Sequence, residues 1–330
     1  MNLGIIGAGT WGMALARMLS NSGHDVQVWS AMGPELDRLA ATRGQKNLPN
    51  MIIPDAITFT KEMKEVCTGK DMLVFAVPSV YVRETARKAN PYITDGQIIV
   101  DVGKGIEAET LMTLSEVIKD EVKADIRVVA LSGPTHAEEV AQDLPSAIIS
   151  ACEDITVAEK VQDVFMNSCM RVYTNTDVKG VELCGALKNI IALASGMSAG
   201  LGYGDNAKAA LITRGLAEIT RLGEKLGCCR ETFAGLAGMG DLIVTATSMH
   251  SRNNRCGYLI GQGYETKDAI KKIGMVVEGI NAIPAAVAFA DKYDVDMPIV
   301  RAVDAIVNRQ ADPKAVVAGL MGRDKRTELE

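Results

Sequence analysis

The sequence predicts an α/β protein. An amino-terminal, doubly wound parallel sheet of the Rossmann type is followed by a second, mostly helical domain. Apolar runs of strand length alternate with helical stretches up to about residue 169. A glycine-rich turn joins the first run to the first helical stretch. Residues 146–283 contain no proline, and from about residue 178 they are rich in Ala, Leu, Ile and Gly at helical spacing. We therefore expect a dinucleotide-binding domain over 1–178 and a helical substrate and catalytic domain over 179–330.

The first unit of the predicted sheet consists of a strand, a glycine turn, a helix and a second strand. The apolar run 3–6 leads into Gly7-Ala8-Gly9-Thr10-Trp11-Gly12, and a second run follows at 26–29. Gly7 permits the tight turn, Gly9 lets the backbone approach a pyrophosphate, and Gly12 lets the helix pack closely on the strand. The N–H groups at the start of the helix then face the phosphates. This context favours a dinucleotide site over a merely structural glycine turn.

Four further apolar runs predict buried strands, at 72–77, 98–102, 128–131 and 147–150. Three of them end in glycine, proline or serine, at Pro78-Ser79, Gly103–Gly105 and Ser132–Thr135. Ligands bind at the carboxyl ends of the strands in this architecture. In the second half, Asp205–Leu226 carries an apolar stripe at helical spacing, with Asp205 as a capping residue and Gly227 as the stop.

Composition excludes several classes of protein. The chain has 330 residues, 48% hydrophobic and 23% charged, with a net charge of −6, which argues against disorder and against nucleic acid as a partner. No basic segment precedes the first strand, and we see no apolar run long enough to span a bilayer. Seven cysteines without a CxxC pair and three histidines argue against a metal site and favour free thiols in the cytoplasm.

Lys188 is the first candidate for catalysis. On a helix its neighbours three and four residues away are Cys184, Gly185, Ile191 and Ala192. None is a carboxylate, and the small ones leave room for a substrate. An apolar setting lowers the pKa of a lysine toward neutrality, which suits acid–base catalysis. The alternative is a surface lysine on an amphipathic helix.

Other polar residues could complete a site. Lys104 lies between two glycines just after a strand and could reach both cofactor and substrate. Asp241 could orient Lys188 or accept a hydroxyl proton, or it could be an ordinary turn residue. Ser251 can cap a helix whose first turn holds Arg252 and Asn253, a combination suited to phosphate. His136, in the loop after the strand at 128–131, is the rival acid–base group, although a capping or packing role is favoured.

Taken in order, many motifs resemble those of one family, the bacterial NAD(P)-dependent glycerol-3-phosphate dehydrogenases. The resemblance covers nearly the whole chain. The motifs are GAGTWG at 7–12, AVPS at 76–79, GKGIE at 103–107, LSGPTHAEEV at 131–140, GVELCGALKNIIALASG at 180–196, GLGYGDNAKAALITRGLAEITRLG at 200–223, GMGDLIVT at 238–245, HSRN at 250–253 and VVEG at 276–279.

The resemblance implies a reaction and a set of roles. The expected reaction reduces dihydroxyacetone phosphate to sn-glycerol 3-phosphate with NAD or NADP, for phospholipid synthesis. Lys188 would be the proton acceptor in the oxidative direction, which demotes His136. The implied substrate residues are Lys104, Gly133, Thr135, Lys188, Asp241, Ser251, Arg252 and Asn253, and the implied cofactor residues are Thr10, Trp11, Lys104, Ala137, Arg252, Val276 and Glu278.

One segment departs from the family pattern. The family often carries a His-Arg pair after the second strand, whereas here Trp29 is followed by Ser30-Ala31-Met32. The segment offers neither an arginine for a 2′-phosphate nor an acid for a free 2′-hydroxyl, so NAD and NADP both remain open. Arg38 or Lys46 could substitute from nearby.

Two other functions stay in view, namely a related β-hydroxyacid dehydrogenase or ketone/imine reductase and a non-catalytic nicotinamide sensor. A homodimer is compatible with the sequence.

Overall fold

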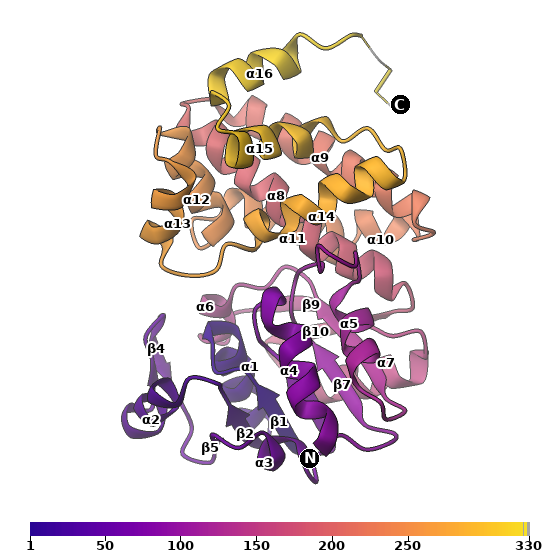
Figure 1. The fold of residues 1–330 in the computed structure, drawn as a ribbon. Coiled ribbons are helices and arrows are strands. Elements are labelled where there is room, and N and C mark those ends of the chain that lie inside the picture. Colours follow the sequence, from indigo (N-terminus) through magenta and orange to yellow (C-terminus); the bar gives the residue numbers. More distant parts are fainter. Residues whose placement is uncertain (326, 329–330) are drawn as a thin grey trace.

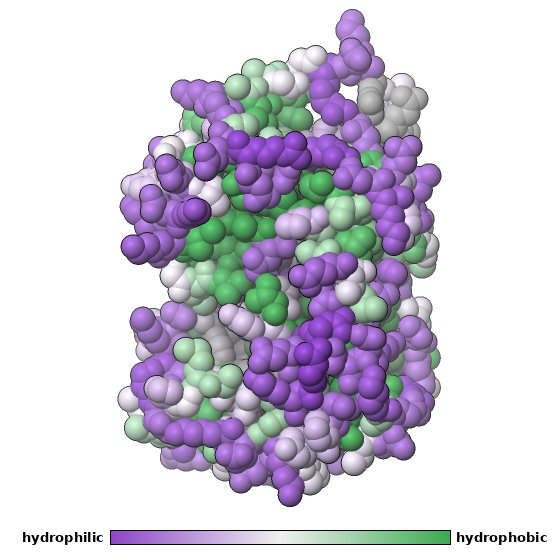
Figure 2. Space-filling model, viewed as in Figure 1, coloured by the Kyte–Doolittle hydropathy of each residue, from purple (hydrophilic) through white to green (hydrophobic). Residues whose placement is uncertain are grey.

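The computed structural model describes residues 1–325, 327 and 328; residues 326, 329 and 330 of the expected helical domain lie outside it. Two halves are stacked on each other, with a twisted sheet and its helices below and a bundle of helices above (Figure 1). The amino terminus lies at the far end of the sheet half, and the chain ends in the helical half. In the space-filling view, apolar side chains gather on the helical half close to its junction with the sheet half (Figure 2).

The sheet half is built on one eight-stranded sheet. A separate hairpin of β3 (Gly44–Gln45) and β4 (Leu48–Ile52) stands beside it. In spatial order the strands of the large sheet are β10 (Met170–Asn175), β9 (Ser146–Ala151), β8 (Arg127–Ser132), β7 (Ile98–Asp101), β6 (Met72–Phe75), β1 (Asn2–Ile6), β2 (Asp25–Trp29) and β5 (Thr58–Thr60). The runs predicted to be strands are all strands, and the doubly wound α/β class is confirmed.

Strand direction differs from the prediction at one place. All neighbouring pairs of the large sheet are parallel except β8 and β9, which are antiparallel, so β9 and β10 run opposite to the other strands. The connection from β8 to β9 contains only the short helix α6 (Ala137–Val140) and does not cross the sheet. Because a parallel return requires a full crossover, the chain reverses direction here instead.

Helices cover both faces of the large sheet and bury the strands on each side. One apolar cluster contains side chains of α1, α2 and α7, and another contains those of α3, α4 and α5. The bounds are α1 (Thr10–Asn21), α2 (Gly33–Thr42), α3 (Met63–Cys67), the 3₁₀ turn η1 (Ser79–Tyr81), α4 (Val82–Ala89), the 3₁₀ turn η2 (Asn90–Tyr92), α5 (Leu114–Glu121) and α7 (Ile155–Phe165). Burial on both faces explains why the strands are apolar throughout.

The helical half packs around one long helix, α8 (Val178–Gly200). The helix predicted at Asp205–Leu226 is present as α9, but Gly204 rather than Asp205 occupies the capping position. The remaining helices are α9 (Asp205–Lys225), α10 (Arg230–Ala234), the π-helix η3 (Leu236–Gly240), α11 (Asp241–Thr247), α12 (Arg252–Gly261), α13 (Thr266–Ile273), α14 (Glu278–Lys292), α15 (Pro298–Arg309) and α16 (Pro313–Met321).

Helix α8 is the central element of the helical half. Its length and composition would allow it to cross a membrane, contrary to the expectation from the sequence. However, 89% of the apolar window is buried inside the protein, as in a core helix. Glycines bring α8 and α12 into close contact. A Cβ on Gly196 would lie 2.0 Å from the carbonyl oxygen of Asn254, and one on Gly257 would lie 2.0 Å from that of Leu193. The two backbones therefore touch directly.

The reversed direction of β9 and β10 also decides where α8 runs. Because β10 leads the chain away from the carboxyl edge of β7 and β8, α8 has to return past that edge to reach the helical half. Gly185 of α8 lies there, since a Cβ on it would be 3.0 Å from Ser132 Oγ and 3.4 Å from Lys104 Cγ. Lys188 follows about one helical turn later, close to the carboxyl edge of β7 and β8.

Candidate active site

Lys188 and Asp241 form a buried ion pair between α8 and α11. Lys188 Nζ donates to Asp241 Oδ1 over 2.6 Å, and the two side chains are among the least exposed charged groups of the protein, at 5% and 1%. No carboxylate lies three or four residues from Lys188 on its own helix. The partner is instead Asp241, the first residue of α11. This contact agrees with one of the two roles considered for Asp241, that of orienting Lys188.

Burial lowers the pKa of Lys188 to a value close to neutral pH. Loss of hydration lowers its pKa to about 7 from the ordinary value of 10.5, the carboxylate of Asp241 opposes this effect, and the charge of Lys104 adds to it. An amine with this pKa exists as both ammonium and free amine near pH 7. It can therefore give or take a proton at little energetic cost.

Lys104 joins the same carboxylate from the sheet half. Its Nζ donates to Asp241 Oδ2 over 2.7 Å and to the carbonyl oxygen of Gly133 over 3.0 Å. Thr135 donates its hydroxyl to that same carbonyl. The structure thus brings together five of the residues expected to bind substrate, namely Lys104, Gly133, Thr135, Lys188 and Asp241. One carboxylate bridges two ammonium groups that come from different halves of the protein.

Thr245 is a member of this cluster that was not predicted from the sequence. Lys188 Nζ hydrogen-bonds to its hydroxyl oxygen, and Thr245 Oγ1 donates to the carbonyl oxygen of Asp241 over 2.6 Å. A signal was available, because residues four apart on a helix share a face and Thr245 follows Asp241 at that spacing. Because the Thr245 hydroxyl accepts one of the hydrogen bonds of the Lys188 ammonium, it restricts the orientation of that group.

The expected anion site lies at the start of α12. Ser251 caps the helix as predicted, its Oγ accepting the N–H of Asn254. Arg252 follows as the first helical residue; burial lowers the pKa of its guanidinium, while the nearby carboxylates of Glu278 and Glu138 oppose that effect. Helix-start N–H groups and a guanidinium are both suited to binding a phosphate.

Asn253 has a second task besides any contact with an anion. Its side-chain oxygen accepts the N–H of Gly279 over 2.8 Å, and its nitrogen donates to Asn189 Oδ1 over 2.9 Å. Asn189 in turn donates to the carbonyl of Gly185 on α8. This chain ties the start of α12 to α14 and to the residue next to Lys188. The local sequence does not indicate a role for Asn189, because its partner is 64 residues away.

Glu278 is held by the loop after β6. Its carboxylate accepts the backbone N–H of Ser79 over 3.1 Å and the hydroxyl of Ser79 over 2.6 Å, and Asn281 also donates to it. We call the Ser79–Glu278 contact the clasp. The clasp joins the two halves beside the Lys104 loop, because a Cβ on Gly105 would lie 2.2 Å from Ser79 Cβ. Val276 lies in the segment just before α14.

The glycine turn has the shape that a pyrophosphate requires. Gly7 adopts a φ of +127°, and a Cβ on it would lie 2.5 Å from the carbonyl oxygen of Ala76. A Cβ on Gly12 would lie 2.1 Å from the carbonyl of Gly7, whereas nothing lies within 4 Å of the corresponding position on Gly9. The turn is therefore packed from behind and open at Gly9, in front of the first N–H groups of α1. These residues fit a dinucleotide.

Side chains around the turn come from three other segments. Thr10 Oγ1 accepts a hydrogen bond from Asn47 of the β3–β4 hairpin over 3.1 Å, a contact the sequence did not predict. Trp11 and Ala137 both pack at the edge of the cluster under α1. After β2, the Ser30 hydroxyl accepts the N–H of Met32. Of the two proposed substitutes for the family's arginine, Arg38 donates to the carbonyl of Gly44, and Lys46 is exposed.

His136 does not take the capping role considered for it. It precedes α6, but its side chain makes no capping hydrogen bond. The ring lies against that of His250, with centroids 5.7 Å apart, and burial lowers its pKa. Packing between these two rings is the role that its geometry indicates.

Comparisons with known proteins support a single family. Residues 2–158 match the description "NAD-dependent glycerol-3-phosphate dehydrogenase N-terminus", and residues 177–318 match its C-terminal counterpart. A glycerol-3-phosphate dehydrogenase [NAD(P)+] 2 of Lactobacillus delbrueckii is 66% identical, covering 99% of this chain and 98% of its own length. One from Bacillus subtilis is 47% identical, covering 99% and 95%.

Solved structures agree with this. A glycerol-3-phosphate dehydrogenase from Coxiella burnetii superposes with a TM-score of 0.93 at 37% identity, covering 98% of this chain and 99% of its own. A ketopantoate reductase from Ralstonia eutropha reaches a TM-score of 0.62 at 14% identity, with 97% and 100% covered, and shares the fold alone.

Proposed function

The chain belongs to the NAD-dependent glycerol-3-phosphate dehydrogenase family, and we propose that it interconverts dihydroxyacetone phosphate and sn-glycerol 3-phosphate with NAD(P)(H). The observation that carries the proposal is the triad Lys104–Asp241–Lys188, in which Asp241 and Lys188 are buried. It places an amine with a pKa of about 7 at the ligand edge of a dinucleotide fold. A ketone reductase requires a proton donor at this place.

The nicotinamide, when bound, supplies or accepts the hydride at the substrate carbon. In reduction, Lys188 Nζ donates a proton to the carbonyl oxygen as charge develops there, and in oxidation the neutral amine takes the hydroxyl proton. Lys104 stabilises the negative charge on the same oxygen. Asp241 keeps both amines within reach of one point, and the Thr245 hydroxyl fixes the direction in which Lys188 points.

The phosphate end is held at the start of α12. Arg252 supplies a guanidinium fork, the first turn supplies N–H groups, and Ser251 and Asn253 fix the backbone there, with Gly133 and Thr135 bordering the other side. Anchoring the substrate at its phosphate restricts the carbonyl to one orientation. Orientation of this kind can lower a barrier by on the order of 7–11 kcal/mol.

The dinucleotide would lie along the sheet edge, against the glycine turn of residues 7–12. Thr10, Trp11 and Ala137 would border its pyrophosphate side, and Lys104, Arg252, Val276 and Glu278 would border its nicotinamide side.

We further propose that the chain divides after residue 178 and self-associates as a homodimer, which light scattering would test. Unpaired cysteines are typical of the cytoplasm, where the product would serve phospholipid synthesis. With a net charge of −6, we expect neither a nucleic-acid nor a membrane partner.

Two substitutions test the assignments. Lys188→Ala should fold and bind cofactor but lose nearly all turnover, because the proton donor is gone; near-normal turnover would remove its catalytic role. Arg252→Ala should raise KM for dihydroxyacetone phosphate far more than KM for the cofactor. Equal effects on both would argue against the phosphate role.

The reaction itself is tested by absorbance of the reduced nicotinamide, with dihydroxyacetone phosphate and either NADH or NADPH. Oxidation that depends on the phosphorylated ketone supports the proposal, and the ratio of the two rates gives the cofactor preference at residues 30–32. If a protein shown to bind one cofactor oxidises neither, the substrate assignment fails. The related ketone reductases would then be tried first.

A further inference from the structure

Glu182 of α8 is a buried carboxyl group that the proposed mechanism does not use. It is 6% exposed, and its oxygens accept the backbone N–H of Ser115 over 2.8 Å and the hydroxyl of Ser115 over 2.5 Å. Burial raises the pKa of Glu182, and the hydrogen bonds from Ser115 and Thr113 oppose that effect. Because a buried carboxylate is costly unless donors surround it, the position of Glu182 depends on Ser115.

The start of α5, where Ser115 lies, closes the loop that carries Lys104. Residues 102–113, which we call the Lys104 loop, connect β7 with α5. Near the two ends of this loop, Ile106 and Thr113 pair with each other as an isolated β-bridge. Ile106 also packs into the apolar core of the helical half. A contact that holds the start of α5 against α8 therefore also holds Lys104, which lies two residues before Ile106.

Helix α8 touches the Lys104 loop at a second point. Gly185 follows Glu182 by three residues and so lies on the same side of the helix. A Cβ on Gly185 would be 3.4 Å from Lys104 Cγ, which shows that the Lys104 side chain lies directly against α8. Lys188 follows after three more residues, about 9 Å along the helix from Glu182. One continuous helix thus carries the proton donor and two contacts with the Lys104 loop.

We propose that Glu182 is a positioning residue, which holds the start of α5 against α8 and thereby keeps the Lys104 ammonium beside that of Lys188. The inference rests on the proposed function, because it gives Glu182 a part in the same reaction. Lys104 binds one oxygen of the Asp241 carboxylate and Lys188 binds the other. If the Lys104 loop moves away from α8, Lys104 leaves that carboxylate, and the charge on the substrate oxygen loses one of its two cations.

The pKa of Lys188 distinguishes positioning from a purely structural role. The charge of Lys104 lowers this pKa, so a Lys104 loop that moves away lets it rise. Loss of the Glu182 charge alone acts in the opposite sense, because a carboxylate raises the pKa of an amine. The charged and titratable groups that act on Lys188 are Asp241, Lys104, Arg252 and His136, and those that act on or near Glu182 are Asp101 and Glu116.

The first measurement is hydrogen exchange by mass spectrometry on the full chain. In Glu182→Gln, an amide nitrogen replaces one acceptor, and the amides of the Lys104 loop should exchange about tenfold faster or more. Ser115→Ala removes the hydroxyl from the same contact without changing any charge, and it should act in the same direction.

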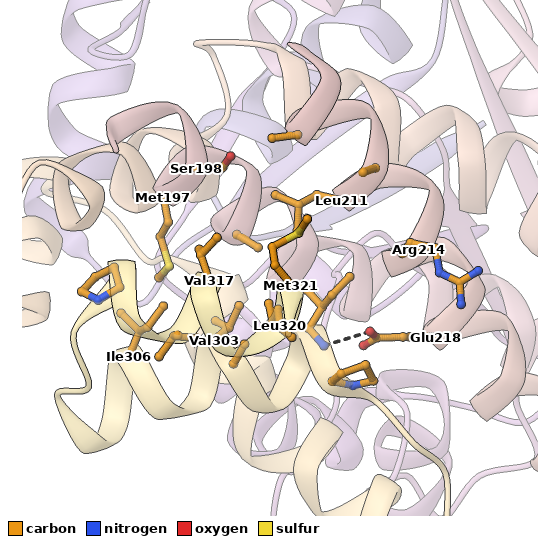
Figure 3. A pocket seen from close by; sticks show the side chains of 18 of the residues that line it. Met197, Ser198, Leu211, Arg214, Glu218, Val303, Ile306, Val317, Leu320 and Met321 are labelled. Carbon is orange, nitrogen blue, oxygen red and sulfur yellow. Dashed lines mark hydrogen bonds between the residues drawn. The ribbon is translucent and has the colours of Figure 1, made fainter. Parts of the chain in front are cut away.

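Glu218→Gln is the matched control for this measurement. Glu218 is also a buried carboxyl group that accepts N–H groups at the start of a helix, in this case α15. Figure 3 shows it beside a pocket lined by α9, α15 and α16, with which the Lys104 loop shares no lining residue. Glu218→Gln should leave exchange in the Lys104 loop unchanged.

The second measurement is kcat for reduction against pH. In Glu182→Gln, kcat should fall about tenfold or more because Lys104 is misplaced. The midpoint of the profile should rise by about one pH unit, because Lys188 keeps its proton to higher pH. Lys104→Met should raise the midpoint as well. The double variant should have the midpoint of Lys104→Met alone, since Glu182 acts through Lys104, and Glu218→Gln should not move it.

Three results would overturn the proposal. One is exchange of the Lys104 loop at the wild-type rate in both Glu182→Gln and Ser115→Ala. Another is a midpoint that stays in place or falls in Glu182→Gln, or in Ser115→Ala if Glu182→Gln does not fold. The third is a double variant in which the two shifts add. Exchange does not depend on turnover, so faster exchange in a protein that does not reduce dihydroxyacetone phosphate would refute the proposed function and still support the hold of Glu182 on the loop.

Discussion

Replacing Asp241 by asparagine should move the pH dependence of catalysis while leaving the fold intact. The buried carboxylate lies 2.6 Å from Lys188 Nζ, and it opposes the effect of burial on that amine. Breaking a buried ion pair on one side costs about 3–5 kcal/mol. At 1.36 kcal/mol per pKa unit, this corresponds to a further fall in the pKa of Lys188 of about 2.2–3.7 units.

The sign of the effect differs between the two directions of the reaction. Reduction requires the ammonium form, which falls from about half of the molecules at pH 7 to about 1% or less once the pKa drops to about 5. Reduction at pH 7 should therefore slow by about 50-fold or more, and it should recover as the pH is lowered toward 5. Oxidation requires the neutral amine, which the substitution favours, so its rate should be much less affected at pH 7.

The assay is kcat against pH in both directions, followed by the absorbance of the reduced nicotinamide. Asp304→Asn is the matched control, because Asp304 is also a buried carboxylate but pairs with Arg309 at the far end of α15. A purely structural defect would lower both directions at every pH. If kcat of the variant changes at the same pH as kcat of the wild type, and the variant still binds cofactor, the claim that Asp241 sets the charge of Lys188 is refuted.

Three further predictions concern the supports of the site. Ser79→Ala removes a hydrogen bond to the Glu278 carboxylate and should weaken NADH binding in a fluorescence titration by about tenfold or more; an unchanged Kd would show that the clasp does not serve the cofactor. Gly257→Ala places a Cβ 2.0 Å from a backbone carbonyl of α8 and should lower the free energy of unfolding by about 1–3 kcal/mol, whereas Gly319→Ala, with nothing within 4 Å, should not lower it. Burial raises the pKa of Asp101 to about 8 from 3.8, so the folded state holds a proton that the unfolded state has lost, and this part of the stability disappears as the pH rises toward 8. Asp101→Asn should remove about 4 kcal/mol of the difference in unfolding free energy between pH 5 and pH 9, measured with urea, and an identical pH dependence in both proteins would contradict it.

The sequence predicted best what depends on short stretches of chain. The glycine turn at 7–12 and the strand at 72–75 each follow from neighbouring residues alone. The cap at Ser251 does too, because the capping side chain and the N–H that it binds are three residues apart. Lys188 stood out because no carboxylate lies three or four residues from it on its own helix.

What the sequence could not give depends on contacts between distant segments. Nothing in the apolar run 147–150 distinguishes a parallel from an antiparallel strand, because the pattern of a buried strand is the same in both directions. The clasp joins residues 199 apart, and Asp241 meets Lys188 across 53. Local patterns carry no information on such pairs, which follow only from the path that α8 takes over the sheet.

The path of α8 divides the chemistry between two bodies. Lys104 and the dinucleotide turn belong to the sheet half, whereas Lys188, Asp241 and Arg252 belong to the helical half. In the proposed mechanism, the proton donor and the hydride-transfer site lie side by side only when the two halves are correctly placed relative to each other. The carboxylate of Asp241 pairs with a lysine from each half, so it links the two halves at the reaction centre. Proton donation and hydride transfer therefore rely on both halves at once, and the Asp241 carboxylate is the contact that the two halves share.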